Sequence, residues 1–86
     1  MLYQIKIHKR VDKFLQFHNF LVKDFFEKVD ILKSDPYNNN LDIKKLQWSN
    51  FKYRIRISKY RFLYEIINDE LIIDIYDADS RGDIYR

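Results

Sequence analysis

The sequence predicts an α+β fold: an N-terminal strand, a helical hairpin, and then a mainly antiparallel four-stranded sheet. Three observations lead to this prediction. Residues 2–7 alternate as a strand does, residues 9–33 space their apolar side chains at helical intervals, and residues 53–76 return to strand-like runs between short polar turns. At 86 residues the chain is expected to form one domain, spanning 1–86, that buries about 60 to 65% of its unfolded surface.

The N-terminal half contains the predicted first strand and both helices. Residues 2–7 should pair with a later strand, because an isolated strand is not stable. Two apolar stripes then predict helices at residues 9–17 and 20–33, with their phenylalanines in the core. The stripes change phase near Asn19, whose side chain can cap the second helix; one long bent helix is the alternative. Asp35-Pro36 should end the helical region, because the residue before a proline is pushed away from helical dihedral angles.

The C-terminal half supplies the sheet. Residues 41–48 predict a weak amphipathic turn that returns Leu46 and Trp48 to the core. Strands are then expected at residues 53–57, 60–67 and 71–76, with turns at 58–59 and 68–70. Because these strands are consecutive and their turns are short, the sheet should be largely antiparallel.

Arginines give the first of these strands a cationic face. Arg54 and Arg56 are two residues apart, so their side chains share one face with Cα atoms about 6.5 to 7 Å apart, a spacing that suits the clamping of phosphates. Arg61 begins the neighbouring strand and Arg81 stands in the tail, so four arginines converge if the tail folds beside the sheet. A solvated strand face is the alternative interpretation of the first two arginines.

Charge is divided unevenly along the C-terminal half. Residues 44–61 contain seven Lys or Arg and no acidic residue, whereas residues 62–80 contain six Asp or Glu and no basic residue. The basic block is interspersed with Trp48, Phe51, Tyr53 and Tyr60. Cationic and aromatic side chains together are typical of a surface that binds an anionic polymer, although they also occur on solvated strands, where Arg54 and Arg56 would pair with Glu65 or Asp74.

Composition argues against several other kinds of site. The chain has no cysteine for a disulfide or a thiolate metal site, and its single glycine excludes a glycine-rich phosphate loop. His8 and His18 are too far apart to bind zinc from one helical turn, and the C-terminal carboxylates are more simply turn and surface residues than magnesium ligands. No apolar run approaches the roughly 18 residues of a membrane span, so a soluble cytoplasmic protein is expected.

Two segments, YRIRISKYRFLYEI at 53–66 and LIIDIYDADSRGDIYR at 71–86, resemble the RelE/ParE superfamily of toxins from type II toxin–antitoxin systems, in particular its RelE-like branch. The pattern YR.R...YR..YE and the terminal R.D.YR agree in residue type, spacing and position relative to the C-terminus. The likeness extends over nearly the whole chain, through the first strand, the helical hairpin and a Lys45-Leu46 step.

The resemblance implies a ribosome-dependent endoribonuclease, or mRNA interferase, whose concave sheet face enters the ribosomal A site. Such toxins use no metal or other cofactor, because the RNA 2′-hydroxyl attacks the adjacent phosphate and leaves a 2′,3′-cyclic phosphate. Carried over by position, RNA phosphate binding falls on Arg54 and Arg56, and catalysis falls on Arg61, Arg81 and Tyr85. Relatives often have lysine at the first two positions; arginine gives up a proton less readily and is expected to act as a charge clamp.

The resemblance also assigns chemical roles and partners. Arg61 and Arg81 would neutralise charge that develops on the phosphate, and Tyr85 would orient the 2′-hydroxyl, stack on a base, or act as the general base. Ser80 stands where many relatives carry His or Lys. The implied partners are a cognate antitoxin protein, the ribosome with A-site messenger RNA, and operator DNA through the antitoxin. The alternatives are a ParE-like, non-nucleolytic toxin that binds DNA gyrase, and an inactive relative that only binds an antitoxin.

Overall fold

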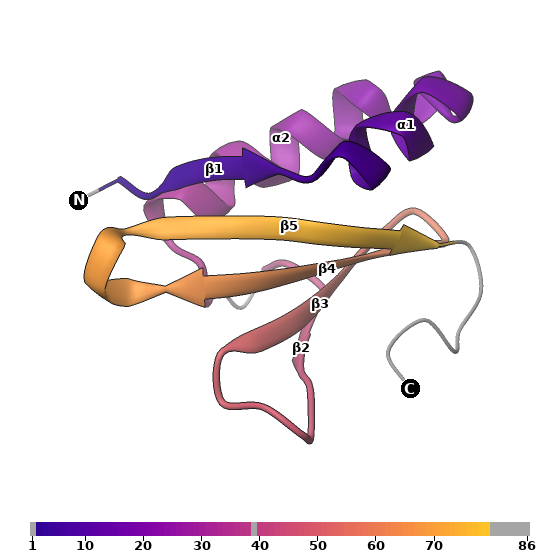
Figure 1. The fold of residues 1–86 in the computed structure, drawn as a ribbon. Helices are drawn as coiled ribbons and strands as arrows, with labels where there is room; N and C mark the ends of the chain where they lie inside the picture. Colours follow the sequence, from indigo (N-terminus) through magenta and orange to yellow (C-terminus); the bar gives the residue numbers. More distant parts are fainter. Residues whose placement is uncertain (1, 39, 80–86) are drawn as a thin grey trace.

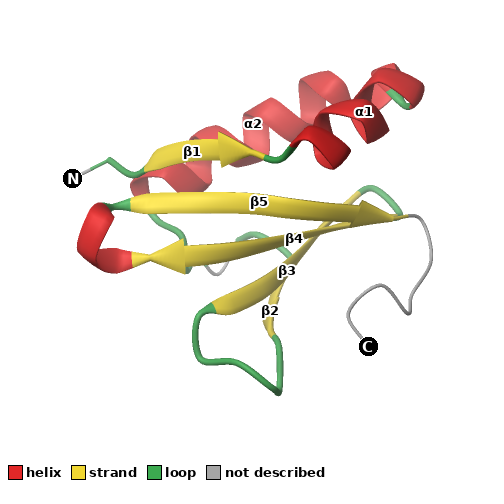
Figure 2. Cartoon of the chain, viewed as in Figure 1, coloured by secondary structure: helices red, strands yellow, loops and turns green. Residues whose placement is uncertain are grey.

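The computed structural model describes residues 2–38 and 40–79, in which two helices cover one face of a five-stranded sheet (Figures 1 and 2). This architecture confirms the expected α+β fold class. In chain order the elements are β1 (Gln4–Ile7), α1 (Lys9–Phe17), a 3₁₀ helix (Asn19–Leu21), α2 (Val22–Ser34), β2 (Ile43–Lys45), β3 (Lys52–Ile57), β4 (Tyr60–Ile67), a second 3₁₀ helix (Asn68–Glu70) and β5 (Ile72–Asp79).

The sheet has the strand order β1-β5-β4-β3-β2. The first strand pairs with the last one in parallel, and every other neighbouring pair is antiparallel. The additional strand β2 lies where the sequence predicted an amphipathic turn, which corrects that prediction. Three residues are too few to show alternation, and β2 is extended because it pairs with Tyr53, Arg54 and Ile55 of β3.

The helices form the expected hairpin. Helix α1 has the predicted bounds, and α2 then returns across the sheet until Lys33 accepts a hydrogen bond from the Tyr3 backbone at 2.8 Å (Figure 1). The expectation that Asn19 caps the second helix was wrong, because Asn19 begins a 3₁₀ helix that joins the two α-helices directly. The His8 side chain instead caps α1, where its Nδ1 accepts from the Arg10 backbone.

The main core lies between the helices and the covered face of the sheet. Phe25, Phe62 and Tyr64 are its largest fully buried side chains. The rings of Phe25 and Phe62 lie 4.9 Å apart between centroids, so they join α2 to β4. The Tyr64 hydroxyl donates to the Pro36 carbonyl at 3.2 Å, and burial raises the pKa of this phenol.

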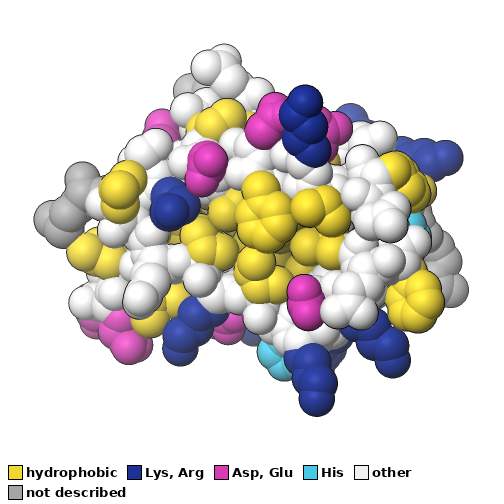
Figure 3. All heavy atoms as spheres, turned by 90° about the horizontal axis from the view of Figure 1, so that it is seen from above, with side chains coloured by type: hydrophobic (Ala, Val, Ile, Leu, Met, Phe, Trp, Pro, Cys, Tyr) yellow, Lys and Arg dark blue, Asp and Glu magenta, His cyan; other side chains and the backbone are white. Residues whose placement is uncertain are grey.

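Several apolar residues expected in the core are exposed. Phe17 is 75% exposed and Phe26 is 46% exposed, because the buried stripe of each helix is narrower than its run of phenylalanines. Trp48 is 57% exposed in the loop after β2, whereas Leu46 is buried as expected. Seen from the helix-bearing side, hydrophobic side chains gather in the middle of the surface (Figure 3). No helix among the described residues is both long and apolar enough to cross a membrane.

Candidate functional site

The pairing of β3 with β4 brings together Arg54, Arg56 and Arg61. Arg56 is directly opposite Arg61 across the two strands, and Arg54 precedes Arg56 by two residues. Residues opposite one another in an antiparallel pair point to the same face. Because Ile55, Ile57 and Phe62 belong to the core, the three arginines lie on the face that the helices leave open.

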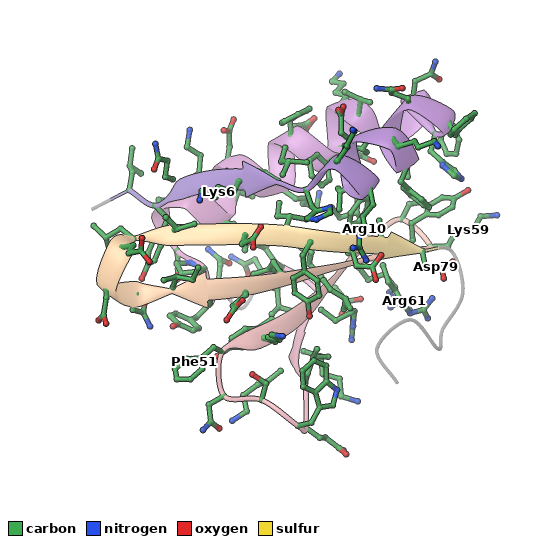
Figure 4. The ribbon with its side chains drawn as sticks, viewed as in Figure 1. Lys6, Arg10, Phe51, Lys59, Arg61 and Asp79 are labelled. Atoms are coloured by element: carbon green, nitrogen blue, oxygen red, sulfur yellow. The ribbon has the colours of Figure 1, made fainter. Side chains whose placement is uncertain are left out.

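Arg61 is half-buried and has no hydrogen bond or ion pair within residues 2–38 and 40–79. Figure 4 shows its side chain on the side of the sheet away from the helices, close to the end of β5. Like charges directly opposite one another in a sheet are destabilising. Arg61 is also opposite Asp79 on its β5 side, so it lies between one like and one opposite charge. The Arg56–Arg61 side of this row favours an anion between the two arginine side chains.

Asp42 lies between β2 and the preceding loop and binds both β3 arginines. Its carboxylate accepts from Arg54 at 2.9 Å and from Arg56 Nε at 2.7 Å. The Asp42 carbonyl also accepts from the Arg56 backbone N–H at 2.9 Å and from the Arg54 guanidinium at 3.3 Å. The partner of these arginines is thus Asp42 and neither of the expected acids, Glu65 or Asp74.

The two β3 arginines differ in how accessible their side chains are to a ligand. The Arg54 side chain is only 12% exposed, whereas that of Arg56 is 49% exposed. Within the described parts of the chain, Arg54 Nε is buried without a hydrogen-bond partner. Arg56 can therefore contact a ligand while it keeps Asp42, and Arg54 chiefly holds the Asp42 carboxylate in place.

The open face is divided by charge across its strands. Lys44 of β2 and Lys52 of β3 extend the cationic side of this face. Lys52 could have been predicted from the sequence, because it stands two residues before Arg54 on the same strand. Asp74, Asp77 and Asp79 lie on β5 at the other side of β4, with Asp79 directly opposite Arg61. A polyanion would be attracted to the β2, β3 and initial β4 region and repelled from β5.

Tyr76 and the acidic side chains limit the reactions that this site could carry out. Burial, followed by the charges of Glu65, Asp77 and Asp74, raises the pKa of Tyr76 to about 12, so this phenol stays protonated at neutral pH and is unsuited as a base. No group of three His, Asp or Glu side chains among the described residues could hold a metal ion. Arg81 and Tyr85, expected to be catalytic, lie outside the described residues.

The Asp42 ion pairs predict a measurable titration. The hydrogen bond from Arg54 lowers the pKa of Asp42 most, with a further lowering by Arg56 against partial desolvation, so the folded value lies below the ordinary 3.8. A depressed carboxyl pKa stabilises the fold above the unfolded value, and this contribution is lost as pH falls through the folded pKa. Carboxyl NMR should show a higher Asp42 midpoint in Arg54→Ala than in Arg56→Ala.

Arg10→Ala is the matched control for this titration, since Arg10 lies near Asp77 and makes no contact with Asp42. It should leave the Asp42 midpoint at the wild-type value. Equal midpoints in wild type and in both β3 variants would contradict persistent ion pairing of Asp42 in solution.

Comparisons with known proteins agree with this fold. No protein-family profile matches the sequence. The chain is 36% identical over 88 residues to a protein of Methanocaldococcus jannaschii described as toxin RelE1, covering 100% of this chain and 98% of the relative. It superimposes on RelE of the archaeal RelE-RelB complex from Pyrococcus horikoshii with a TM-score of 0.82 at 33% identity, covering 96% of this chain and 99% of that one.

More distant structures share the fold. A mutant of the Escherichia coli toxin RelE in the free state gives a TM-score of 0.78 at 16% identity, covering 95% of this chain and 86% of that one. The RelBE2 toxin–antitoxin complex of Mycobacterium tuberculosis gives 0.73 at 19% identity, covering 94% of this chain and 100% of that one. At these identities the likeness concerns the fold alone. The full-length match to the M. jannaschii relative shows more, and the chain belongs to the RelE family of toxins from toxin–antitoxin systems.

Proposed function

We propose that this toxin is a ribosome-dependent endoribonuclease that cleaves messenger RNA in the A site without a catalytic metal. The observation that carries this proposal is the Arg56–Arg61 pair on the open face of the sheet. Two cations facing each other across neighbouring strands provide a fixed position for one phosphate. Membership of the RelE family supports messenger RNA as the proposed substrate, and no described feature favours the gyrase-binding alternative.

The chemistry follows from where charge develops. When the RNA 2′-hydroxyl attacks the adjacent phosphate, the O2′–P bond forms as the hydroxyl proton is lost, and negative charge accumulates on the equatorial oxygens. The bond from phosphorus to the 5′-oxygen of the next nucleotide then breaks, and that oxygen takes up a proton to leave as a hydroxyl. Guanidinium groups carried on neighbouring strands lie close to that charge and can stabilise it. Arg61 is the proposed catalytic cation and Arg56 the phosphate contact, while Arg54 holds Asp42. Arg81 and Tyr85 remain proposed catalytic residues on the strength of the family pattern.

The proposed partners follow from the family and from the charge of the site. A cognate antitoxin is the expected protein partner, since the P. horikoshii and M. tuberculosis relatives occur in complexes with their antitoxins. The antitoxin would cover the cationic side of the sheet and carry the toxin to operator DNA. Action on ribosomes places the free toxin in the cytoplasm.

Ribosomes programmed with a defined messenger RNA and an empty A site provide the test. The purified toxin should cut within the A-site codon and leave a 2′,3′-cyclic phosphate, and it should leave the same RNA intact without ribosomes. A single 2′-deoxy nucleotide at the attacking position should stop cleavage there, because the nucleophile is then missing. Ribosomes require Mg²⁺, so this substitution is a cleaner test of the mechanism than chelation.

Two outcomes would contradict the proposal. Uncut message together with inhibited supercoiling in a parallel gyrase assay would assign the chain to the ParE-like class. Uncut message without an effect on gyrase would indicate an inactive relative that only binds its antitoxin.

A further inference from the structure

A small pocket at the β2 edge of the open face has no part in the cleavage chemistry described above. Its volume is about 210 Å³. Pockets for drug-sized ligands measure about 300 to 1,000 Å³, so this one suits a single small unit of a longer molecule. Its lining consists of Lys44, Lys45, Leu46, Gln47, Trp48 and Arg54.

The lining of the pocket is positively charged, as expected of a site that binds an anion. Three of its side chains are cationic and none is acidic. Lys44 and Arg54 are cross-strand partners on β2 and β3, so they stand side by side on the open face. Asp42 pairs with the Arg54 guanidinium from outside the pocket, whereas Lys44 and Lys45 are exposed to solvent. An anionic ligand would therefore contact the two lysines first.

Trp48 adds an aromatic surface that is held in place. Its side chain is 57% exposed, and the Lys52 ammonium lies 5.1 Å from the centroid of the ring. The same ammonium lies 5.3 Å from the Tyr76 ring, so Lys52 fixes the indole against β5. The loop itself is closed by a hydrogen bond of 2.9 Å from the Leu46 N–H to the Lys52 carbonyl. Exposed aromatic rings beside cations are the usual stacking platforms for unpaired bases.

The pocket lies close to the proposed phosphate position. Arg54 lines the pocket, and Arg56 follows it by two residues, at about 6.5 to 7 Å along the strand. Arg56 in turn is opposite Arg61. An RNA strand with one phosphate between Arg56 and Arg61 can therefore place a neighbouring nucleotide over the pocket.

We propose that this pocket binds one nucleotide of single-stranded RNA, with its base stacked on Trp48 and its phosphate beside Lys44 and Lys45. The pocket would hold the nucleotide next to the cleaved one, an assignment that rests on the proposed function. A base and a phosphate use both the aromatic and the cationic parts of the lining. An apolar peptide would offer no partner to Lys44 and Lys45.

Trp48 is the only tryptophan of the chain, so its fluorescence reports on the pocket directly. A single-stranded oligoribonucleotide with 2′-O-methyl groups throughout cannot be cut and is the probe. Titration into the free toxin should quench the fluorescence to saturation. An oligomer of equal length with abasic sites should bind through its phosphates but quench little. Equal quenching by both oligomers would overturn the stacking assignment.

Substitutions give the second test, with affinity measured by anisotropy of a labelled oligomer. Trp48→Ala should weaken binding about 5- to 150-fold, the range for loss of one stacked base, and Trp48→Phe should restore most of it. Phe51→Ala is the control, because Phe51 is an equally exposed aromatic of the same loop, at 56%, and lines a separate hollow with Glu65 and Asn68. Unchanged affinity in a folded Trp48→Ala variant would overturn the proposal.

The pocket and the proposed function can fail separately. Arg61→Ala should lose cleavage on ribosomes and bind the uncleavable probe more weakly, but a saturating amount of the probe should still quench Trp48. Quenching by a wild-type toxin that cuts no ribosome-bound message would support the pocket and reject the nuclease. If Trp48→Ala binds RNA normally but no longer co-purifies with its co-expressed antitoxin, the pocket belongs to the protein partner and the RNA proposal is wrong.

Discussion

Replacing Arg61 by alanine is expected to reduce ribosome-dependent cleavage by about 10²- to 10³-fold, the usual effect of removing one preorganised donor from a developing oxyanion. The fold should persist, because Arg61 is half-buried and no hydrogen bond or ion pair joins it to other described residues. Arg61 is opposite both Arg56 and Asp79, so its removal takes away one like-charge and one opposite-charge neighbour, and the melting temperature should change little. Cleavage rates and thermal unfolding measured on the same preparation check both parts.

Lys59→Ala is the matched control for Arg61→Ala. Lys59 is exposed in the β3–β4 turn, and its replacement removes the same charge two residues away (Figure 4). It should retain nearly full cleavage. Equal losses in the two variants would mean that general attraction to the ribosome, and no specific phosphate contact, explains the effect. A large drop in the melting temperature of Arg61→Ala would show that Arg61 stabilises the fold, and the loss of cleavage could then not be assigned to a phosphate contact.

Phe25→Ala should have the largest effect on stability. Phe25 is fully buried and packs against Phe62 with centroids 4.9 Å apart. Truncating a buried phenylalanine costs about 3 to 5 kcal/mol, a large part of the roughly 5 to 15 kcal/mol that stabilises a small domain. Urea denaturation followed by circular dichroism should show a midpoint far below that of the wild type. Much of the variant should be unfolded near 37 °C.

Phe26→Ala is the matched control, because it separates the loss of core packing from the change in helix propensity. Phe26 touches Phe25 edge to face at 5.1 Å but is 46% exposed. Both variants place the same small residue in the middle of α2, so only the buried volume differs between them. Phe26→Ala should lower the free energy of unfolding by much less than Phe25→Ala. Similar losses in the two variants would contradict the core described for the helix–sheet interface.

Much of the fold was predictable because local patterns decide it. The bounds of α1 and the hairpin of β3 and β4 follow from apolar periodicity, which burial against one core imposes. The strand β2 did not follow, because its three residues are extended only through pairing with β3. The exposure of Trp48 was missed for a related reason. That pairing fixes where the loop leaves the sheet, and no local property of the indole reports it.

The candidate site was predictable in its residue types and less so in its pairing. Alternation placed Arg54 and Arg56 on one face, and the short turn placed Arg61 beside them. Their partner Asp42 lies 12 and 14 residues earlier in the chain. Acids on adjacent strands were the natural candidates from sequence, and only the β2–β3 register brings Asp42 close enough. Charge patterns thus identified the cationic face but not the carboxylate that organises it.

The parallel pairing of β1 with β5 has a consequence for how the toxin is made. Gln4 aligns with Ile72, so the first strand gains its sheet neighbour only when the last strand has been synthesised. Residues so far apart in sequence pair late, because closing the long intervening loop costs entropy before the contact forms. A nascent chain that ends before residue 72 lacks this edge of the sheet. The five-stranded sheet is therefore completed only after β5 has been synthesised.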